Sequence, residues 1–210
     1  GDLRRRLLLA HLAELDRSLA ALGGRLRVEH GDATVVVPRL AHRLGSEQVF
    51  WNGDTTPYAV HRDDTVDEAL DAKAVITWGT MVHPPGTVLT KGGSVSLVFT
   101  PFHTAWERRG WDPWPSIDDT TTVAVLDDPG DGLPPPDGPP PEEPGERGAL
   151  TRLAEFEDHA ADYLDERDLP AIDGTSRLSA HLRFGTISPR RVATEIGQRG
   201  AGRSGFVRQL

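Results

Sequence analysis

Residues 173–192 read Asp-Gly-Thr-Ser-Arg-Leu-Ser-Ala-His-Leu-Arg-Phe-Gly-Thr-Ile-Ser-Pro-Arg-Arg-Val and form the chemically densest stretch of the chain. Gly174 permits a tight turn, and the five residues after it supply three hydroxyl groups and one arginine. Such a turn at a helix start can bind phosphate, because free N–H groups and the helix dipole favour an anion there. The spacing alone favours a simpler interpretation, in which Thr175 or Ser176 caps a short helix and Arg177 is solvated. The choice between a phosphate site and a helix cap depends on the rest of the chain.

The composition limits the classes of protein that the chain can belong to. It has 210 residues, of which 37% are hydrophobic, and it has no cysteine. This length suits one large domain or two small ones around an apolar core. The lack of cysteine excludes disulfides, thiolate metal sites and cysteine nucleophiles, and with no signal peptide in view we expect a cytoplasmic protein. No apolar run approaches the roughly 18–20 residues that span a bilayer, and the eight histidines show no metal-binding spacing. We therefore expect neither a membrane partner nor a metal site.

The formal net charge of −9 is distributed unevenly. Residues 126–148 contain seven acidic residues and one arginine, whereas residues 175–210 contain seven arginines and one glutamate, a local balance of 7 − 1 = +6. The acidic total argues mildly against a nucleic-acid partner. The basic end is nevertheless compatible with a phosphate-rich partner, although a run of charge is most often a solvated surface.

Helix and strand patterns alternate through the first 126 residues. The leucine stripe from Leu8 to Leu22 indicates an amphipathic helix. Further helices are predicted at residues 34–44, 63–72 and 100–109, and strands at residues 25–30, 48–51, 74–78 and 122–125. The alternation favours an α/β fold with a doubly wound, Rossmann-like parallel sheet, in which ligands bind beyond the carboxyl ends of the strands. The glycine-rich dinucleotide motif and the P-loop motif are both absent.

The second half of the chain has a different character. Two proline triplets with glycine and acids predict an extended linker, although a proline-recognition ligand is conceivable. Helical patterns follow at residues 149–164, 178–185 and 189–199. The predicted organisation is an α/β domain at residues 1–126, a Pro- and acid-rich linker at 127–148 and the first part of an all-α domain at 149–210.

Four stretches carry a resemblance to a known family. They are Asn52…Pro57-Tyr58…Arg62-Asp63, then His83-Pro84-Pro85-Gly86-Thr87-Val88-Leu89-Thr90-Lys91…Gly93, then Val98-Phe99-Thr100-Pro101-Phe102…Trp106, and finally Tyr163…Arg167-Asp168-Leu169-Pro170…Gly174-Thr175-Ser176-Arg177-Leu178-Ser179, continuing through Leu182 to Pro189. In this order, across an α/β domain, a linker and a helical domain, they make the chain resemble the DNA photolyase/cryptochrome family.

The resemblance implies a fold, cofactors and a partner. The N-terminal α/β domain of this family can hold an antenna chromophore, a folate or a deazaflavin, and the helical domain binds FAD. Photolyases repair pyrimidine dimers in damaged DNA by light-driven electron transfer from reduced flavin, whereas cryptochromes use the scaffold for light signalling. Matched by motif, Tyr163, Thr175, Ser176, Arg177, Leu178 and Ser179 are the expected FAD-binding residues. Arg167 matches an arginine beside the DNA path, where a guanidinium can hold a phosphate.

Two departures from the family pattern have consequences. Family members open with a strand and helix that carry an Asp-Leu-Arg motif, and we expect this chain to lack that first strand; the tryptophan-rich helix that the family has after the match to residues 206–210 is expected beyond the chain. We therefore expect an internal fragment whose catalytic residues, the electron-transfer tryptophans, lie beyond the chain end. The missing first strand would lie at the sheet centre, so the strands at residues 26–30 and 74–77 are expected to have open edges. Residues 75–80 also lack the acids that many folate-binding members have there.

Three functions remain open at this stage. The leading hypothesis is that the parent protein is a deoxyribodipyrimidine photo-lyase, a monomer that repairs damaged DNA with FAD and light. The alternatives are a cryptochrome-type blue-light photoreceptor without repair activity and a small-molecule-binding α/β module without photochemistry. Residues 1–210 alone are expected to be poorly stable, free of flavin and inactive.

Overall fold

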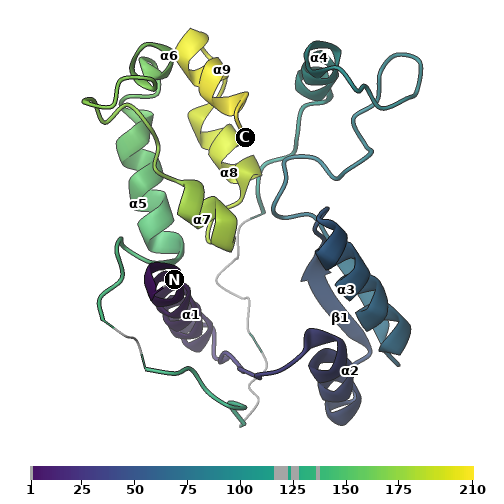
Figure 1. Cartoon of the computed structure of the whole chain (residues 1–210). Helices are drawn as coiled ribbons and strands as arrows, with labels where there is room; N and C mark the ends of the chain where they lie inside the picture. Colours follow the sequence, from purple (N-terminus) through teal and green to yellow (C-terminus); the bar gives the residue numbers. More distant parts are fainter. Residues whose placement is uncertain (1, 116–122, 124–127, 136–137) are drawn as a thin grey trace. The chain divides into compact units, whose positions relative to one another are not determined.

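The computed structural model describes residues 2–115, 123, 128–135 and 138–210 (Figure 1). The chain divides into two compact units, which we describe separately. The helical unit comprises Gly1–Leu26, Thr80–Asp127 and Leu133–Leu210, and the sheet unit comprises Arg27–Gly79 and Asp128–Gly132. Within the described ranges, no helix is both long and apolar enough to cross a lipid bilayer.

The sheet unit is built on two parallel strands joined by a helical crossover. In chain order it contains α2 (Ala33–Leu44), β1 (Gln48–Asn52), α3 (Pro57–Ala69) and β2 (Lys73–Thr77). The strands pair with Gln48 opposite Lys73. Helix α2 begins where the Asp32 carboxylate accepts the Thr34 N–H and ends at Gly45 in the left-handed conformation, as its sequence signals require. The parallel pair confirms a mixed α/β fold.

The predicted elements of this unit are mostly confirmed, with one displacement and one correction. The helix predicted at residues 63–72 begins earlier, at Pro57, because proline is well suited to the first turn. The strand predicted at residues 25–30 is wrong as a strand: its described residues form only a bridge between Val28 and Gly130. A strand needs a paired strand beside it, and residues 25–30 lie beside a short turn instead.

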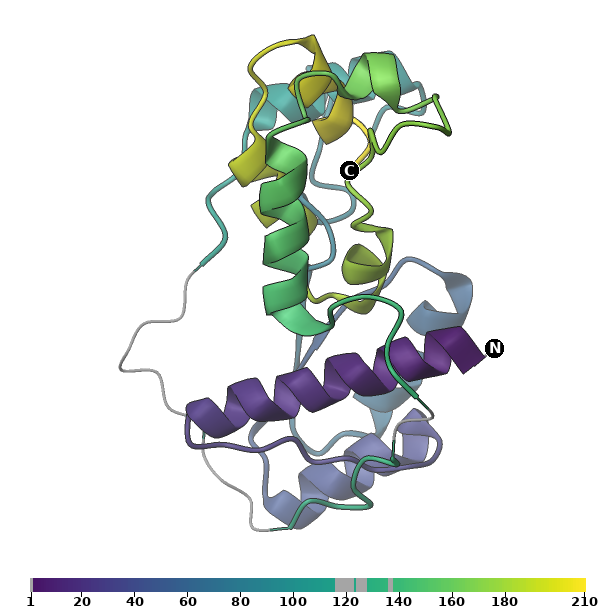
Figure 2. The same ribbon diagram turned by 90° about the vertical axis from the view of Figure 1, so that its left-hand side faces the viewer.

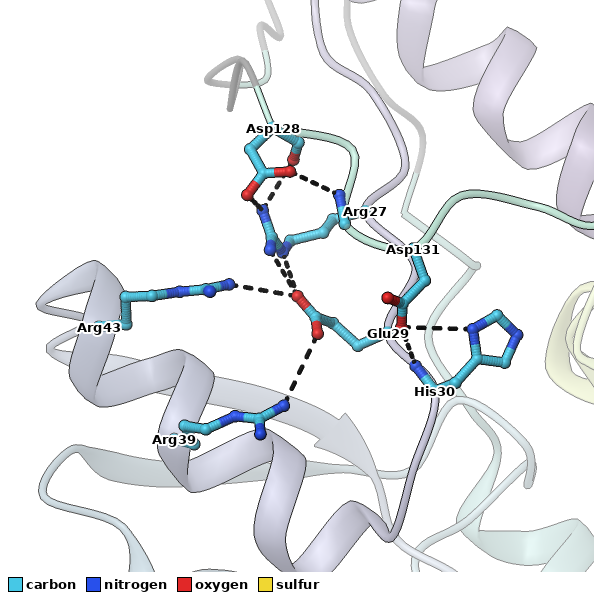
Figure 3. Close-up of polar contacts among 8 residues, drawn as sticks. Arg27, Glu29, His30, Arg39, Arg43, Asp128 and Asp131 are labelled. Atoms are coloured by element: carbon cyan, nitrogen blue, oxygen red, sulfur yellow. Dashed lines mark hydrogen bonds and ion pairs between the residues drawn. The ribbon is translucent and has the colours of Figure 1, made fainter.

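That turn, residues 128–131, is fastened to residues 27–30 by polar contacts (Figure 3). The Val28 N–H donates to the Pro129 carbonyl at 3.0 Å, and the Asp131 N–H donates to the Val28 carbonyl at 2.7 Å. Asp131 also accepts the His30 N–H at 2.7 Å. Residues 26–30 therefore form no strand with an open edge, because their single bridge is made to the polar turn.

The helical unit has the larger apolar core. Its helices are α1 (Asp2–Ala21), α4 (Phe99–Arg109), α5 (Gly145–Glu157), α6 (Tyr163–Glu166), α7 (Ser179–Phe184), α8 (Pro189–Ile196) and α9 (Ala201–Val207). Helix α5 packs against α1, α7 and α8, and α9 packs against α6 and α8; Figure 2 shows α1 crossing one end of α5. The core centres on the fully buried side chains of Leu178, Val192 and Val207.

Several predictions for this unit change in detail. Helices predicted at residues 178–185 and 189–199 are confirmed as α7 and α8, whereas α9 was not predicted. Helix α5 begins inside the predicted linker and ends at Glu157, before the predicted residue 164. The strand predicted at residues 122–125 lies outside the described residues, apart from Val123. Helix α1 is confirmed, but Leu8 is exposed and His11 is buried, because α1 turns its His11 face toward α5.

Candidate functional site

Residues 173–179 form an irregular turn between α6 and α7. Gly174 lies directly against α6, since a Cβ added there would come within 2.3 Å of the Glu166 Cβ. Arg177 has a φ of 51°, and among the described residues no other non-glycine residue has a positive φ. Leu178 is completely buried and ties the turn to the core. The backbone of the turn is therefore fixed at both ends by packing.

The side chains of the turn do not cap the following helix. The N-cap residue of α7 is Leu178, and no side chain caps this helix. Ser176 Oγ instead accepts the Leu178 N–H at 3.3 Å. The simpler interpretation, in which Thr175 or Ser176 caps the helix, is therefore wrong.

The remaining polar groups of the turn face solvent. Thr175 and Ser179 are exposed, and within the described part of the chain their hydroxyl groups have no hydrogen-bond partner. Arg177 Nε lies 2.7 Å from Asp173 Oδ1, so an exposed carboxylate already balances its charge. Two free hydroxyl donors on a rigid turn can bind an anion, with Arg177 adding a cation at the rim.

Tyr163 and Arg167 lie together on α6 and its C-terminal end. The Tyr163 ring makes edge-to-face contacts with Phe156 and Phe206, at centroid distances of 6.0 and 5.2 Å. The Arg167 guanidinium carbon lies 5.7 Å from the centroid of the Tyr163 ring. A hydrogen bond with Tyr163, followed by the charge of Asp168, raises the pKa of Arg167. Arg167 is exposed and keeps its charge at every ordinary pH.

Packing places the expected site residues on adjoining elements. The backbone of Gly174 touches Glu166 on α6, the helix that begins with Tyr163. Leu178 differs from the other expected residues because its side chain is enclosed in the core. It can support the turn but cannot present its side chain to a ligand.

Two histidines, one on α1 and one on α7, are buried in the helical unit. His181 on α7 places Nδ1 2.8 Å from Thr186 Oγ1, and its ring meets that of His11 edge-on at 5.5 Å. Burial lowers the pKa of His181. Burial and the neighbouring His181 lower the pKa of His11 to about 4. Both rings are therefore neutral near pH 7 and are packed inside the helical unit.

The basic end of the chain is partly neutralised. Arg191 lies 3.3 Å from Glu146, and Arg203 lies 3.7 Å from Glu157. Arg199 and Arg208 have no ion pair among the described residues. The +6 balance of the sequence therefore overstates the charge that is free to meet a ligand. The described residues contain no group of three or more histidine, aspartate or glutamate side chains that could hold a metal ion.

Sequence reasoning missed one feature. Arg167 lines a groove of about 590 Å³ formed by α4, α6 and α9, together with Phe99, His103 and Arg208. Phe99 belongs to one of the four motif stretches and Arg208 to the basic end, but nothing in the sequence pairs positions so far apart.

The chain combines a pair of parallel strands with a helical region and a turn whose hydroxyl groups face solvent. The family model described as DNA photolyase matches residues 1–118, more than half of the chain. The chain belongs to the DNA photolyase family, and its parallel strands match the N-terminal domain of photolyases.

Individual relatives agree with this assignment. A deoxyribodipyrimidine photo-lyase from a Synechococcus strain is 35% identical over 198 residues, which cover 85% of this chain and 41% of that protein. The crystal structure of a class III photolyase from Agrobacterium tumefaciens has a TM-score of 0.79 at 29% identity and covers 99% of this chain and 48% of that one. An archaeal photolyase from Sulfolobus tokodaii, determined with two FAD molecules, has a TM-score of 0.72 at 23% identity, over 100% of this chain and 46% of that one, which shows the fold alone. The chain spans less than half the length of these relatives.

Proposed function

We propose that the protein that carries this chain is a deoxyribodipyrimidine photo-lyase, which repairs pyrimidine dimers in DNA with FAD and light. Homology to photo-lyases at about 35% identity supports this function. The observation that carries the proposal is the turn at residues 173–179. It keeps the hydroxyls of Thr175 and Ser179 in solvent instead of using them as helix caps.

The residues of the turn fit a diphosphate. Thr175 and Ser179 would donate hydrogen bonds to the FAD phosphates, and Arg177 would reduce the repulsion between negative charges. Ser176 fixes the backbone through Leu178, whose buried side chain anchors the turn. Reduced FAD held by these residues would supply the electron for splitting the dimer.

Two further residues would belong to the site beside this turn. Tyr163 is held by two aromatic rings and would limit the position of the cofactor beside α6. Arg167 is exposed and would contact a phosphate of the damaged DNA, since a guanidinium can donate two parallel hydrogen bonds. The division into domains at residues 1–126, 127–148 and 149–210, the monomeric state and a folate or deazaflavin antenna remain part of the same proposal.

The test is a repair assay on the complete gene product. The purified protein is reduced and illuminated with an oligonucleotide that contains a thymine dimer, and the dimer is quantified by chromatography. We expect loss of the dimer in light and none in darkness. Bound, reduced flavin without repair would contradict the proposal and favour a cryptochrome, whereas a colourless protein would favour the small-molecule-binding module.

A further inference from the structure

The groove between α4, α6 and α9 offers aromatic and cationic groups on the same surface. It measures about 590 Å³ and is lined by Phe99, His103, Leu164, Arg167, Ala201, Ser204, Gly205, Arg208 and Gln209. This is within the size range of cavities that bind small organic molecules. The turn that we assign to FAD contributes none of these residues, so the groove is a separate feature.

The aromatic part of the groove is a short stack on α4. The rings of Phe99 and His103 are 5.6 Å apart with an interplanar angle of 22°. His103 is held in place from one side by Glu107, whose carboxylate lies 3.5 Å from His103 Nδ1. The Phe99 side chain is 51% exposed, although a phenylalanine is normally well buried. The described residues therefore leave about half of this side chain uncovered.

The cationic part of the groove comes from the two arginines. The Arg208 guanidinium carbon lies 4.8 Å from the centroid of the Phe99 ring. Within the described residues Arg208 has no ion pair, and Arg167 on the other side has only Asp168, at 3.5 Å. Arg208 is thus a flat cation resting on an exposed ring, in the position that a flat base would take.

We infer that this groove binds one nucleotide of a single nucleic-acid strand, with the base on Phe99 and the phosphate on Arg208. The inference rests on the proposed function, because it places a further part of the DNA. The base would displace the Arg208 guanidinium from the ring, and the guanidinium would then pair with the phosphate. Stacking of bases on aromatic side chains and pairing of arginines with phosphates are the two contacts that dominate binding of single strands.

The experiment measures the affinity of the complete gene product for a fluorescent single-stranded oligothymidylate, by anisotropy at two salt concentrations. We expect Phe99→Ala to raise Kd by about tenfold, since stacking on one aromatic ring contributes that order of affinity. We expect Phe99→Tyr, which keeps the ring, to bind like the wild type. Arg208→Gln should raise Kd by about fivefold and reduce the slope of log Kd against log salt by about 1.

Matched variants separate this site from general effects. Leu97 is 100% exposed just before α4 and Arg199 is an exposed arginine outside the groove, so Leu97→Ala and Arg199→Gln should leave the oligothymidylate Kd unchanged. The inference is wrong if Phe99→Ala or Arg208→Gln binds like these controls, or if the wild type binds no oligothymidylate. It is also wrong if Phe99→Leu binds like the wild type, because then an apolar contact and not a stacked base covers the ring. Absence of dimer repair with the expected Kd changes would defeat the proposed function and leave this inference standing.

Discussion

The helical unit and the sheet unit are each stabilised by a different kind of interaction. The helical unit has completely buried side chains on several helices, among them Leu178, Val192 and Val207. The sheet unit leaves Phe50 63% exposed and Ile76 48% exposed on its two strands. A two-stranded sheet with two helices has little apolar area to bury, and such small units are marginally stable.

Polar contacts contribute a larger share of the stability of the sheet unit. Glu29 is 15% exposed and is surrounded by three arginines, Arg27, Arg39 and Arg43 (Figure 3). Arg27 also contacts Asp128 at 2.9 Å, and both Glu29 and Asp128 raise its pKa. The helical unit therefore depends on packing, and the sheet unit depends on charges. Salt should therefore change the stability of the sheet unit, whereas cavities should change the stability of the helical unit.

The largest expected change in stability comes from a cavity in the helical unit. Leu178→Ala should lower the free energy of unfolding by about 2–5 kcal/mol, because Leu178 is completely buried. Urea denaturation of the complete gene product measures this change. Leu97→Ala is the matched control, expected within about 0.5 kcal/mol of the wild type because Leu97 is fully exposed. Equal stabilities for the two variants would contradict the packed core.

The second effect is a pH dependence of the helical unit. The pKa of His11 falls from 6.5 to about 4 on folding, so the stabilisation is fully present above pH 6.5 and is lost as the pH falls toward 4. Between about pH 7.5 and about pH 5 the free energy of unfolding should fall by about 2 kcal/mol through this residue. The lowered pKa of His181 acts in the same direction.

Variants separate His11 from other acid effects. His11→Phe should flatten the pH dependence of the free energy of unfolding, because its side chain cannot be protonated. His61→Gln, at an exposed position on α3, should leave that dependence unchanged. An unaltered slope in His11→Phe would show that His11 is not held neutral in the folded protein.

The smallest effect belongs to the sheet unit. Glu29→Gln removes the negative charge among three arginines and should lower the melting temperature by a few degrees at low salt. The difference from the wild type should shrink at high salt, because repulsion between the arginines is then screened. Glu68→Gln, an exposed position on α3, is the control. A loss that is independent of salt would mean that the cluster acts by shape and not by charge.

Sequence patterns predicted the elements whose signals are local. The helix predicted at residues 34–44 is observed as α2, with Asp32 as its cap and Gly45 at its end. Tertiary contacts determined the remaining elements. The buried face of α1 follows from the hydrogen bond of 2.9 Å between the Gly145 N–H and His11 Nδ1, which no leucine stripe reveals.

Helix α9 is a second feature that local sequence patterns do not predict. Its glycines lower helix propensity, so no local pattern predicts this helix. Packing explains them, since a Cβ on Gly202 would come within 1.9 Å of the Ala161 carbonyl oxygen. A local motif predicts Thr175 and Ser179 as site residues, whereas the contact of Arg208 with Phe99 joins distant segments and needed the structure.

The flavin content of the complete gene product tests directly whether residues 173–179 hold the FAD diphosphate. The wild type and the double variant Thr175→Val/Ser179→Ala are purified in parallel, with Thr65→Val on α3 as the control. Absorbance of released FAD gives the molar ratio of FAD to protein. We predict close to one FAD in the wild type and in Thr65→Val, and a severalfold loss in the double variant. Equal FAD in all three proteins would contradict the assignment of residues 173–179 to the diphosphate.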